Sequence, residues 1–87
     1  MKTFKLIISS PDGNLFDGDV CQLDVRGVEG ELAVMAGHIP FVTALKAAPC
    51  RIHLPDGAIK EGILNGGLLS VGNEQTTMIA SSFKFTE

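Results

Sequence analysis

The residue types that most often carry chemistry are few in this chain of 87 residues. It contains two cysteines, Cys21 and Cys50, and two histidines, His38 and His53. A tetrahedral metal site needs about four converging ligands. Cys50 and His53 are three residues apart, and on a strand an odd spacing places side chains on opposite faces. The spacing therefore favours core thiols and a surface imidazole over a metal site.

A cysteine nucleophile activated by histidine is the second chemistry to consider. Either cysteine could meet His38 in space, and an adjacent imidazole is what activates a thiol. Both Cys21 and Cys50, however, fall on the apolar phase of an alternating apolar and polar pattern. Thiols buried in apolar surroundings have raised pKa values and are inert. We therefore expect both cysteines to act as small core residues.

Two carboxylates, Glu29 and Glu31, flank Gly30. At a turn, carboxylates are usually solvated and without a role. On a rigid hairpin, two acids would instead form a recognition point for a basic partner. Residues 29–45 also place turn residues and a histidine between apolar runs, which suits either a binding loop or a structural crossover. The residues alone leave these alternatives open.

The glycine-rich stretches do not predict a phosphate site. Asn65-Gly66-Gly67 and Pro55-Asp56-Gly57 lack the following helix that such a site uses. They predict hairpin turns that need positive φ angles. Similar breaks recur about every 6–12 residues, at Pro11-Asp12-Gly13, Asp17-Gly18, Glu29-Gly30, Ala36-Gly37 and Gly72-Asn73.

Between the breaks, apolar residues recur with period two, as half-buried strands require. Residues 21–25 and 50–54 show this most clearly, 68–71 predict a short buried strand, and 76–80 are weaker because both faces are partly apolar. Residues 41–48, which precede Pro49, are also predicted as a strand because their first three residues favour extended structure. The pattern predicts an all-β, flattened β-sandwich or barrel of about ten short strands, as one domain over residues 1–87.

Composition excludes several classes of protein. A hydrophobic fraction of 45% and a net charge of −3 are not those of a disordered chain. Seven scattered Lys and Arg residues, without Trp or Tyr, argue against a nucleic-acid partner. A chain of this size buries about 60% of its surface, which supports one modest core and no deep active site.

The amino end does not read as a targeting segment. Its apolar run, residues 6–8, is shorter than the roughly 7–15 residues of a signal-peptide core. No stretch approaches the roughly 18 apolar residues of a membrane span. We expect a soluble, unexported chain in a reducing compartment, since two cysteines do not form a disulfide framework.

Residues 28–46, VEGELAVMAGHIPFVTALK, resemble the signature of the rotary ATP synthase epsilon subunit, which is close to G-x-E-G-E-L-G-x-x-P-G-H-A-P-x-x-T-x-L-K. Three further stretches agree in order and spacing: residues 9–20 (SSPDGNLFDGDV), 65–71 (NGGLLSV) and 76–80 (TTMIA). The resemblance covers nearly the whole chain. Ala33 and Ala36 replace a usual Gly and Pro, and Ala47-Ala48-Pro49 replaces a usual Pro-Gly, which concerns loop geometry rather than the fold.

The resemblance implies a flattened ten-stranded sandwich that is a non-catalytic rotor subunit of a proton- or sodium-translocating ATP synthase. It would link the gamma subunit to the ring of c subunits in the central stalk, at the cytoplasmic face of the inner membrane of a bacterium. It implies no cofactor, metal, small-molecule substrate, nucleic acid or direct membrane span. Family members usually continue into a helical hairpin, so this chain should neither inhibit ATP hydrolysis nor bind ATP. A free-standing β-sandwich that binds another protein or a ligand is the alternative.

The family's contact residues carry over by position. The residues expected to face the c-subunit ring are Glu29, Gly30, Glu31 and Leu32. The residues expected to face the gamma subunit are Ser10, His38 and Thr43. For His38 two roles stay open: an interface contact, or a turn residue that holds the loop of residues 37–40 by a hydrogen bond.

Overall fold

A computed structural model describes residues 2–86, which form strands and turns without a helix. Within that range, no helix exists that could cross a membrane. The strands are β1 (Phe4–Ser10), β2 (Gly13–Val20), β3 (Gln22–Gly27), β4 (Gly30–Met35), β5 (Phe41–His53), β6 (Ile59–Val71), β7 (Gln75–Ala80) and β8 (Phe83–Phe85).

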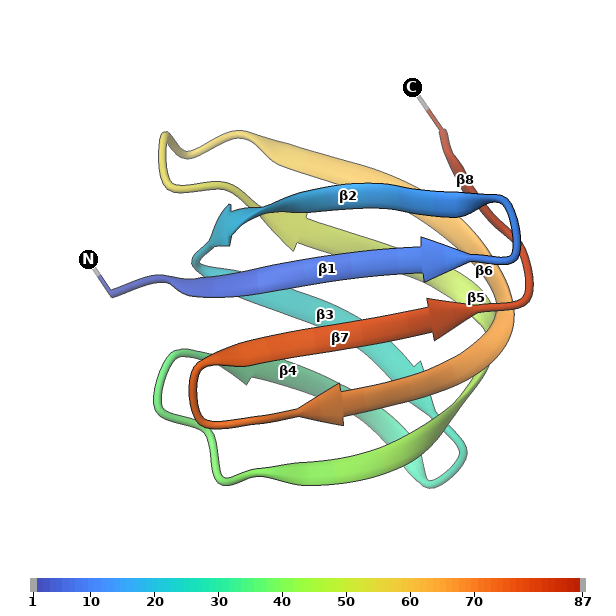
Figure 1. Cartoon of the computed structure of the whole chain (residues 1–87), viewed down its shortest axis with the longest axis horizontal. Coiled ribbons are helices and arrows are strands. Elements are labelled where there is room, and N and C mark those ends of the chain that lie inside the picture. The colour runs from blue at the N-terminus through green and yellow to red at the C-terminus, as the bar shows by residue number, and fades with distance from the viewer. Residues whose placement is uncertain (1, 87) are drawn as a thin grey trace.

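The strands form one open sheet that folds over into two layers (Figure 1). The order is β2-β1-β7-β6-β5-β3-β4, and β8 pairs with β6. β5 and β6, at 13 residues each, belong to both layers. The first half of β5 and the second half of β6 continue the front layer from β7, and the other halves lie between β3 and β8 in the back layer. The predicted β-sandwich is confirmed, with eight strands rather than ten because two strands serve both layers.

Three predicted breaks are wrong. Residues 41–53 form one strand that continues through Pro49. The pairing of β3 with β5 is interrupted between Asp24 and Gly27, so β3 offers no hydrogen-bond partner opposite Pro49. The missing N–H of proline therefore costs no ladder hydrogen bond. Asn65-Gly66-Gly67 is a bend inside β6, with Gly66 at a φ of 100°. Asp17-Gly18 lies inside β2. The turn predicted at residues 55–57 is confirmed, and there the Gly57 N–H donates to the carbonyl oxygen of Leu54.

The core lies between the layers and is apolar. Its fully buried side chains come from seven strands, β1 to β7: Leu6, Ile8, Val20, Leu23, Val34, Cys50, Ile52, Leu64, Leu69 and Met78. Burying one such aliphatic side chain contributes about 1.5–3 kcal/mol. Thr76 is the buried polar residue of the described chain. Along each strand, the apolar residues of the alternating sequence pattern therefore face this core, and the residues between them face outward.

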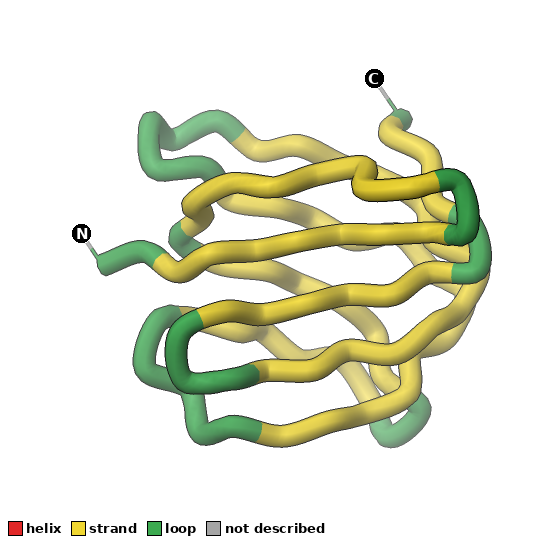
Figure 2. The backbone as a smooth tube through the Cα atoms, in the orientation of Figure 1, coloured by secondary structure: helices red, strands yellow, loops and turns green. Residues whose placement is uncertain are grey.

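The turns gather at two opposite ends of the sandwich (Figure 2). Gly27, Leu45, Gly67 and Ala80 are successive partners across four strands, so the β3–β4 turn and the bends of β5 and β6 lie at one end. The β1–β2 turn lies there too, because Ser9 pairs with Ile79. We call this the tip end. The β4–β5 loop and the β6–β7 turn lie at the other end, which we call the loop end (Figure 1).

Candidate partner-binding surfaces

The β3–β4 turn is a rigid two-residue tip. Gly27 pairs with Gly30, which leaves Val28 and Glu29 as the turn residues. Gly30 has a φ of 134°, a conformation that residues with a Cβ rarely adopt. The Val28 N–H donates to the carbonyl oxygen of Ala44, 3.1 Å away, and so fastens the tip to β5. Both turn residues are exposed, which makes the tip accessible to a partner.

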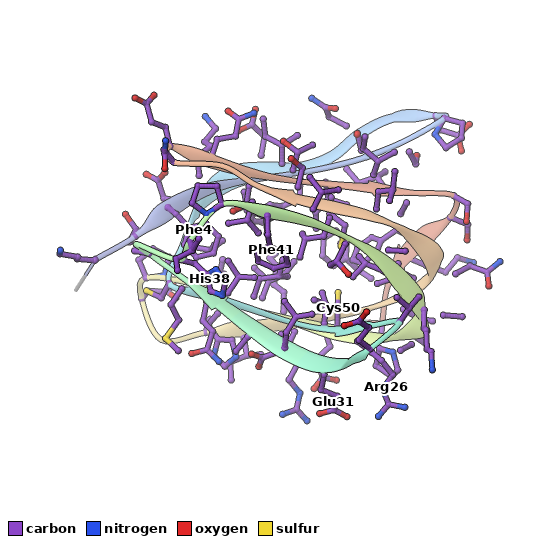
Figure 3. All side chains as sticks on the ribbon, turned by 90° about the horizontal axis from the view of Figure 1, so that it is seen from below. Phe4, Arg26, Glu31, His38, Phe41 and Cys50 are labelled. Atoms are coloured by element: carbon purple, nitrogen blue, oxygen red, sulfur yellow. The ribbon has the colours of Figure 1, made fainter. Side chains whose placement is uncertain are left out.

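The two acids near the tip differ in their surroundings. Glu31 lies directly opposite Arg26 across the hairpin, and its carboxylate accepts a hydrogen bond from the guanidinium in an ion pair (Figure 3). Salt bridges between the described residues do not include Glu29, which is exposed. Leu32 is half-buried and packs against the core. Of the four residues predicted to face the ring, Glu29 thus offers the uncompensated charge.

The structure does not bring together the three residues predicted to face gamma. Ser10 lies at the tip end, where its Oγ accepts a hydrogen bond from the Asp12 N–H at 3.2 Å. His38 lies in the loop of residues 36–40 at the opposite end. Thr43 lies between them on β5, pairs with the buried Leu69 and so points toward the core. Their spacing along the sequence could not show this separation.

His38 holds the β4–β5 loop. Its backbone N–H donates to the carbonyl oxygen of Met35 at 3.1 Å. Its Nδ1 lies 2.9 Å from the carbonyl oxygen of Ile39, so that nitrogen carries the proton and donates. The imidazole ring also packs against the ring of Phe41, with centroids 5.0 Å apart (Figure 3). These contacts support the turn role that the sequence left open.

An exposed apolar patch on the front layer was missed by sequence reasoning. It comprises Val42, Ala44, Leu68 and Ile79, and we call it the apolar patch. Leu68 pairs directly with both Ala44 and Ile79, so the side chains form a continuous row across three strands. Leu68 and Ile79 are 50% and 53% exposed, and Val42 is 67% exposed. The signal was present in the sequence, because adjacent apolar residues such as Leu68 and Leu69 cannot both face the core.

The outer face of the back layer carries hydrogen-bonded polar pairs beside the exposed side chains of Ile59 and Ile63. Asp24 accepts hydrogen bonds from the Nε2 atoms of Gln22 and His53, at 2.7 and 2.8 Å. Arg51 Nε donates to Glu61 at 3.0 Å. A shallow groove of about 740 Å³ lies where β5 leaves β3, and Arg26, Glu31 and Arg51 line it. These polar pairs distinguish the outer face of the back layer from the apolar patch of the front layer.

The two cysteines differ in burial. Cys50 is buried, and burial raises the pKa of its thiol to about 11, against a smaller lowering by the hydrogen bond with the Gly62 backbone. This confirms the expected inert thiol for Cys50, whereas Cys21 is half-buried. Across residues 2–86, no group of three or more His, Cys, Asp or Glu side chains lies close enough to hold a metal ion.

Comparison with known proteins places this geometry in a family. The family described as ATP synthase, delta/epsilon chain, β-sandwich domain matches residues 3–86. The ATP synthase epsilon chain of Bacillus licheniformis is 37% identical over 87 residues, which are 100% of this chain and 66% of that one. The sodium-ion-specific ATP synthase epsilon chain of Acetobacterium woodii is 34% identical over 86 residues, 99% of this chain and 65% of that one. The chain thus spans just under two thirds of the length of these relatives.

Solved structures share the fold at lower identity. A chain of the Euglena gracilis mitochondrial ATP synthase, in a structure of OSCP, F1 and c-ring, superposes with a TM-score of 0.90 at 20% identity, over 95% of this chain and 53% of that one. A chain of the Tetrahymena thermophila mitochondrial ATP synthase, in a structure of the central stalk and c-ring, superposes with a TM-score of 0.79 at 13% identity. The match covers 95% of this chain and 66% of that one. The chain belongs to the ATP synthase delta/epsilon family, of which it forms the β-sandwich domain.

Proposed function

We propose that residues 1–87 form the single β-sandwich domain of a non-catalytic rotor subunit, which links the gamma subunit to the c-subunit ring of a proton- or sodium-translocating ATP synthase. The observation that carries this proposal is the pairing of two unlike surfaces on one rigid fold. The front layer presents the apolar patch, and the tip end presents an exposed acid on a fixed turn. A linking subunit needs two such independent surfaces.

The apolar patch is the surface we assign to the gamma subunit. Ser70 and Thr77, which lie beside it on the same face, are uncharged, so a partner can cover this side of the patch without burying an unpaired charge. Burying the exposed half of Leu68 or Ile79 would contribute about 1 kcal/mol each. A stalk partner that remains bound during rotation requires contacts of this kind rather than screened surface charges.

The tip end is the surface we assign to the c-subunit ring. Glu29 sits on a turn whose shape is fixed by Gly30 and by the hydrogen bond from Val28. A rim charge of this kind steers encounter and sets orientation more than it adds affinity. It would meet basic residues in polar loops at the membrane surface. The subunit would thereby be peripheral, at the cytoplasmic face of a bacterial inner membrane.

The side chains that could be reactive are instead used to hold the fold together, which fits a structural role. His38 holds a loop, His53 is hydrogen-bonded to Asp24, and Cys50 is buried with a raised pKa. Each of these groups is engaged in the fold itself. The proposed subunit therefore transmits rotation and contributes no catalytic group to ATP synthesis.

Binding to purified gamma subunit and to a purified c-subunit ring from the same organism tests the proposal. The double variant Leu68→Ser/Ile79→Ser should weaken gamma binding about 30-fold, which corresponds to the roughly 2 kcal/mol lost. Ile63→Ser is the matched control, because Ile63 is 52% exposed in β6 of the back layer. It should change gamma binding less than about twofold. A folded chain that binds neither gamma nor the ring would instead support the free-standing interaction module.

A further inference from the structure

Ile39 is the most exposed large hydrophobic side chain of the described residues. It is 78% exposed, at the centre of the β4–β5 loop. Two further exposed apolar residues flank the loop: Met35 ends β4, and Val42 is the second residue of β5. Val42 also belongs to the apolar patch and lies three residues after Ile39, so the loop that carries Ile39 leads directly into that patch. Contiguous exposed apolar surface of this kind marks an interaction site.

The loop that carries Ile39 is fixed from several directions. Gly37 has a φ of 85°, which reverses the chain, and Pro40 has its φ fixed by its ring. His38 bonds through its backbone to Met35 and through Nδ1 to the carbonyl oxygen of Ile39. Its ring packs on Phe41 (Figure 3). An apolar side chain on a preorganised loop loses little conformational entropy when a partner binds it.

We propose that Ile39 is an anchor that inserts into an apolar pocket of the gamma subunit, and that His38 is a positioning residue that aims it. This inference rests on the proposed function and names a contact of that same surface. The partner is the one that covers the apolar patch, because Val42 of that patch is the second residue of β5, directly after the loop that carries Ile39. Its pocket must be uncharged and about the size of a branched aliphatic side chain. His38 acts through the loop and not through a contact of its own with gamma.

The first test compares Ile39→Ala with Ile63→Ala for binding to the gamma subunit. Both substitutions remove the same atoms from an exposed isoleucine, but Ile63 lies in β6 of the back layer. We expect Ile39→Ala to weaken gamma binding about tenfold or more, as for an interface anchor, and Ile63→Ala less than about twofold. Thermal melting should be the same for both variants and the unchanged chain, since neither side chain is in the core.

The positioning role is tested by a double-mutant cycle. His38→Ala should weaken gamma binding in the chain that keeps Ile39, and should add no further loss in the chain that carries Ile39→Ala. A merely structural loss at His38 would add the same factor in both backgrounds and would overturn the positioning role.

The outcomes separate this inference from the proposed function. Full-strength gamma binding by Ile39→Ala, together with weakened binding by Leu68→Ser/Ile79→Ser, would overturn the anchor and leave the proposed function standing. Loss of self-association by Ile39→Ala in analytical ultracentrifugation, with gamma binding unchanged, would assign the anchor to a second copy of this chain and overturn the inference as well. Failure of the unchanged chain to bind gamma would overturn the proposed function itself.

Discussion

Gly62 lies so close to the Phe83 ring that any side chain at this position should destabilise the fold. Gly62 lies in the half of β6 that pairs with β8, and a Cβ built on it would lie 2.3 Å from Cζ of Phe83. Two further ring atoms would lie within 3.0 Å. Phe83 is half-buried against the core and meets the ring of Phe85 edge-on, with centroids 5.0 Å apart. Gly62→Ala must therefore displace the Phe83 ring.

Three contributions set the expected change in the free energy of unfolding. Loss of a half-buried phenylalanine from its site costs about 2 kcal/mol, roughly half the value for a fully buried ring. Disturbing the ring pair with Phe85 costs about 0.5–1.5 kcal/mol. Replacing glycine by alanine in a strand returns about 0.5–1 kcal/mol. Gly62→Ala should thus destabilise the fold by about 1.5–3 kcal/mol.

Urea denaturation followed by far-UV circular dichroism measures this change, in a cycle of Gly62→Ala, Phe83→Ala and the double variant. With the Phe83 ring removed, the new methyl group has space, and Gly62→Ala should become neutral or stabilising. Equal destabilisation in both backgrounds would refute the reasoning. Gly67→Ala is the control, because its Cβ would lie 2.1 Å from the backbone oxygen of Ile79. It should destabilise the chain whether or not Phe83 is present.

Three further predictions follow from single residues. Burial in the folded state raises the pKa of the Cys50 thiol from 9.0 to about 11, so the free energy of unfolding should be highest below about pH 9 and fall by about 2–3 kcal/mol as the pH rises to 11. Urea titrations at pH 8 and pH 11 measure this change, which should be absent in Cys50→Ala. Glu29→Lys should weaken docking to the c-subunit ring more than Glu31→Lys, because Glu31 is already paired with Arg26; equal losses in a ring pull-down would contradict this. Gly30→Ala should lower stability by about 1 kcal/mol through backbone strain alone, as measured by thermal melting, since its Cβ would meet no atom within 4 Å.

The strands were predictable because the alternation of side-chain types is local. Residues 22–25, 50–53 and 76–80 lie in strands with the predicted apolar phase facing the core, whereas Cys21 and Leu54 lie just outside the strands and are half-buried. The continuity of β5 and β6 was not predictable, because it depends on neighbours distant in sequence. Pro49 is tolerated only because β3 has left β5 there, and Gly66 bends β6 without ending it. Proline and glycine mark where backbone geometry changes, and pairing decides whether the strand ends.

The candidate surfaces were predictable to a different degree. Once the two-residue turn at Val28 and Glu29 is assumed, the hairpin register places Arg26 opposite Glu31, so that ion pair could have been derived from the sequence. The grouping of Val42, Leu68 and Ile79 could not, since it depends on β5, β6 and β7 being neighbours. Motif similarity gave positions along the chain, whereas only the sheet order shows which of them share a surface.

The two strands that serve both layers have a mechanical consequence. In a sandwich whose layers are held only by side-chain packing, a lateral force can slide one layer over the other. Here β5 and β6 cross from layer to layer as unbroken backbone, hydrogen-bonded to each other along most of their length. Shear between the layers would have to bend both strands together, and their shared ladder stiffens them against that bending. A force applied to the front layer would therefore move the back layer with it.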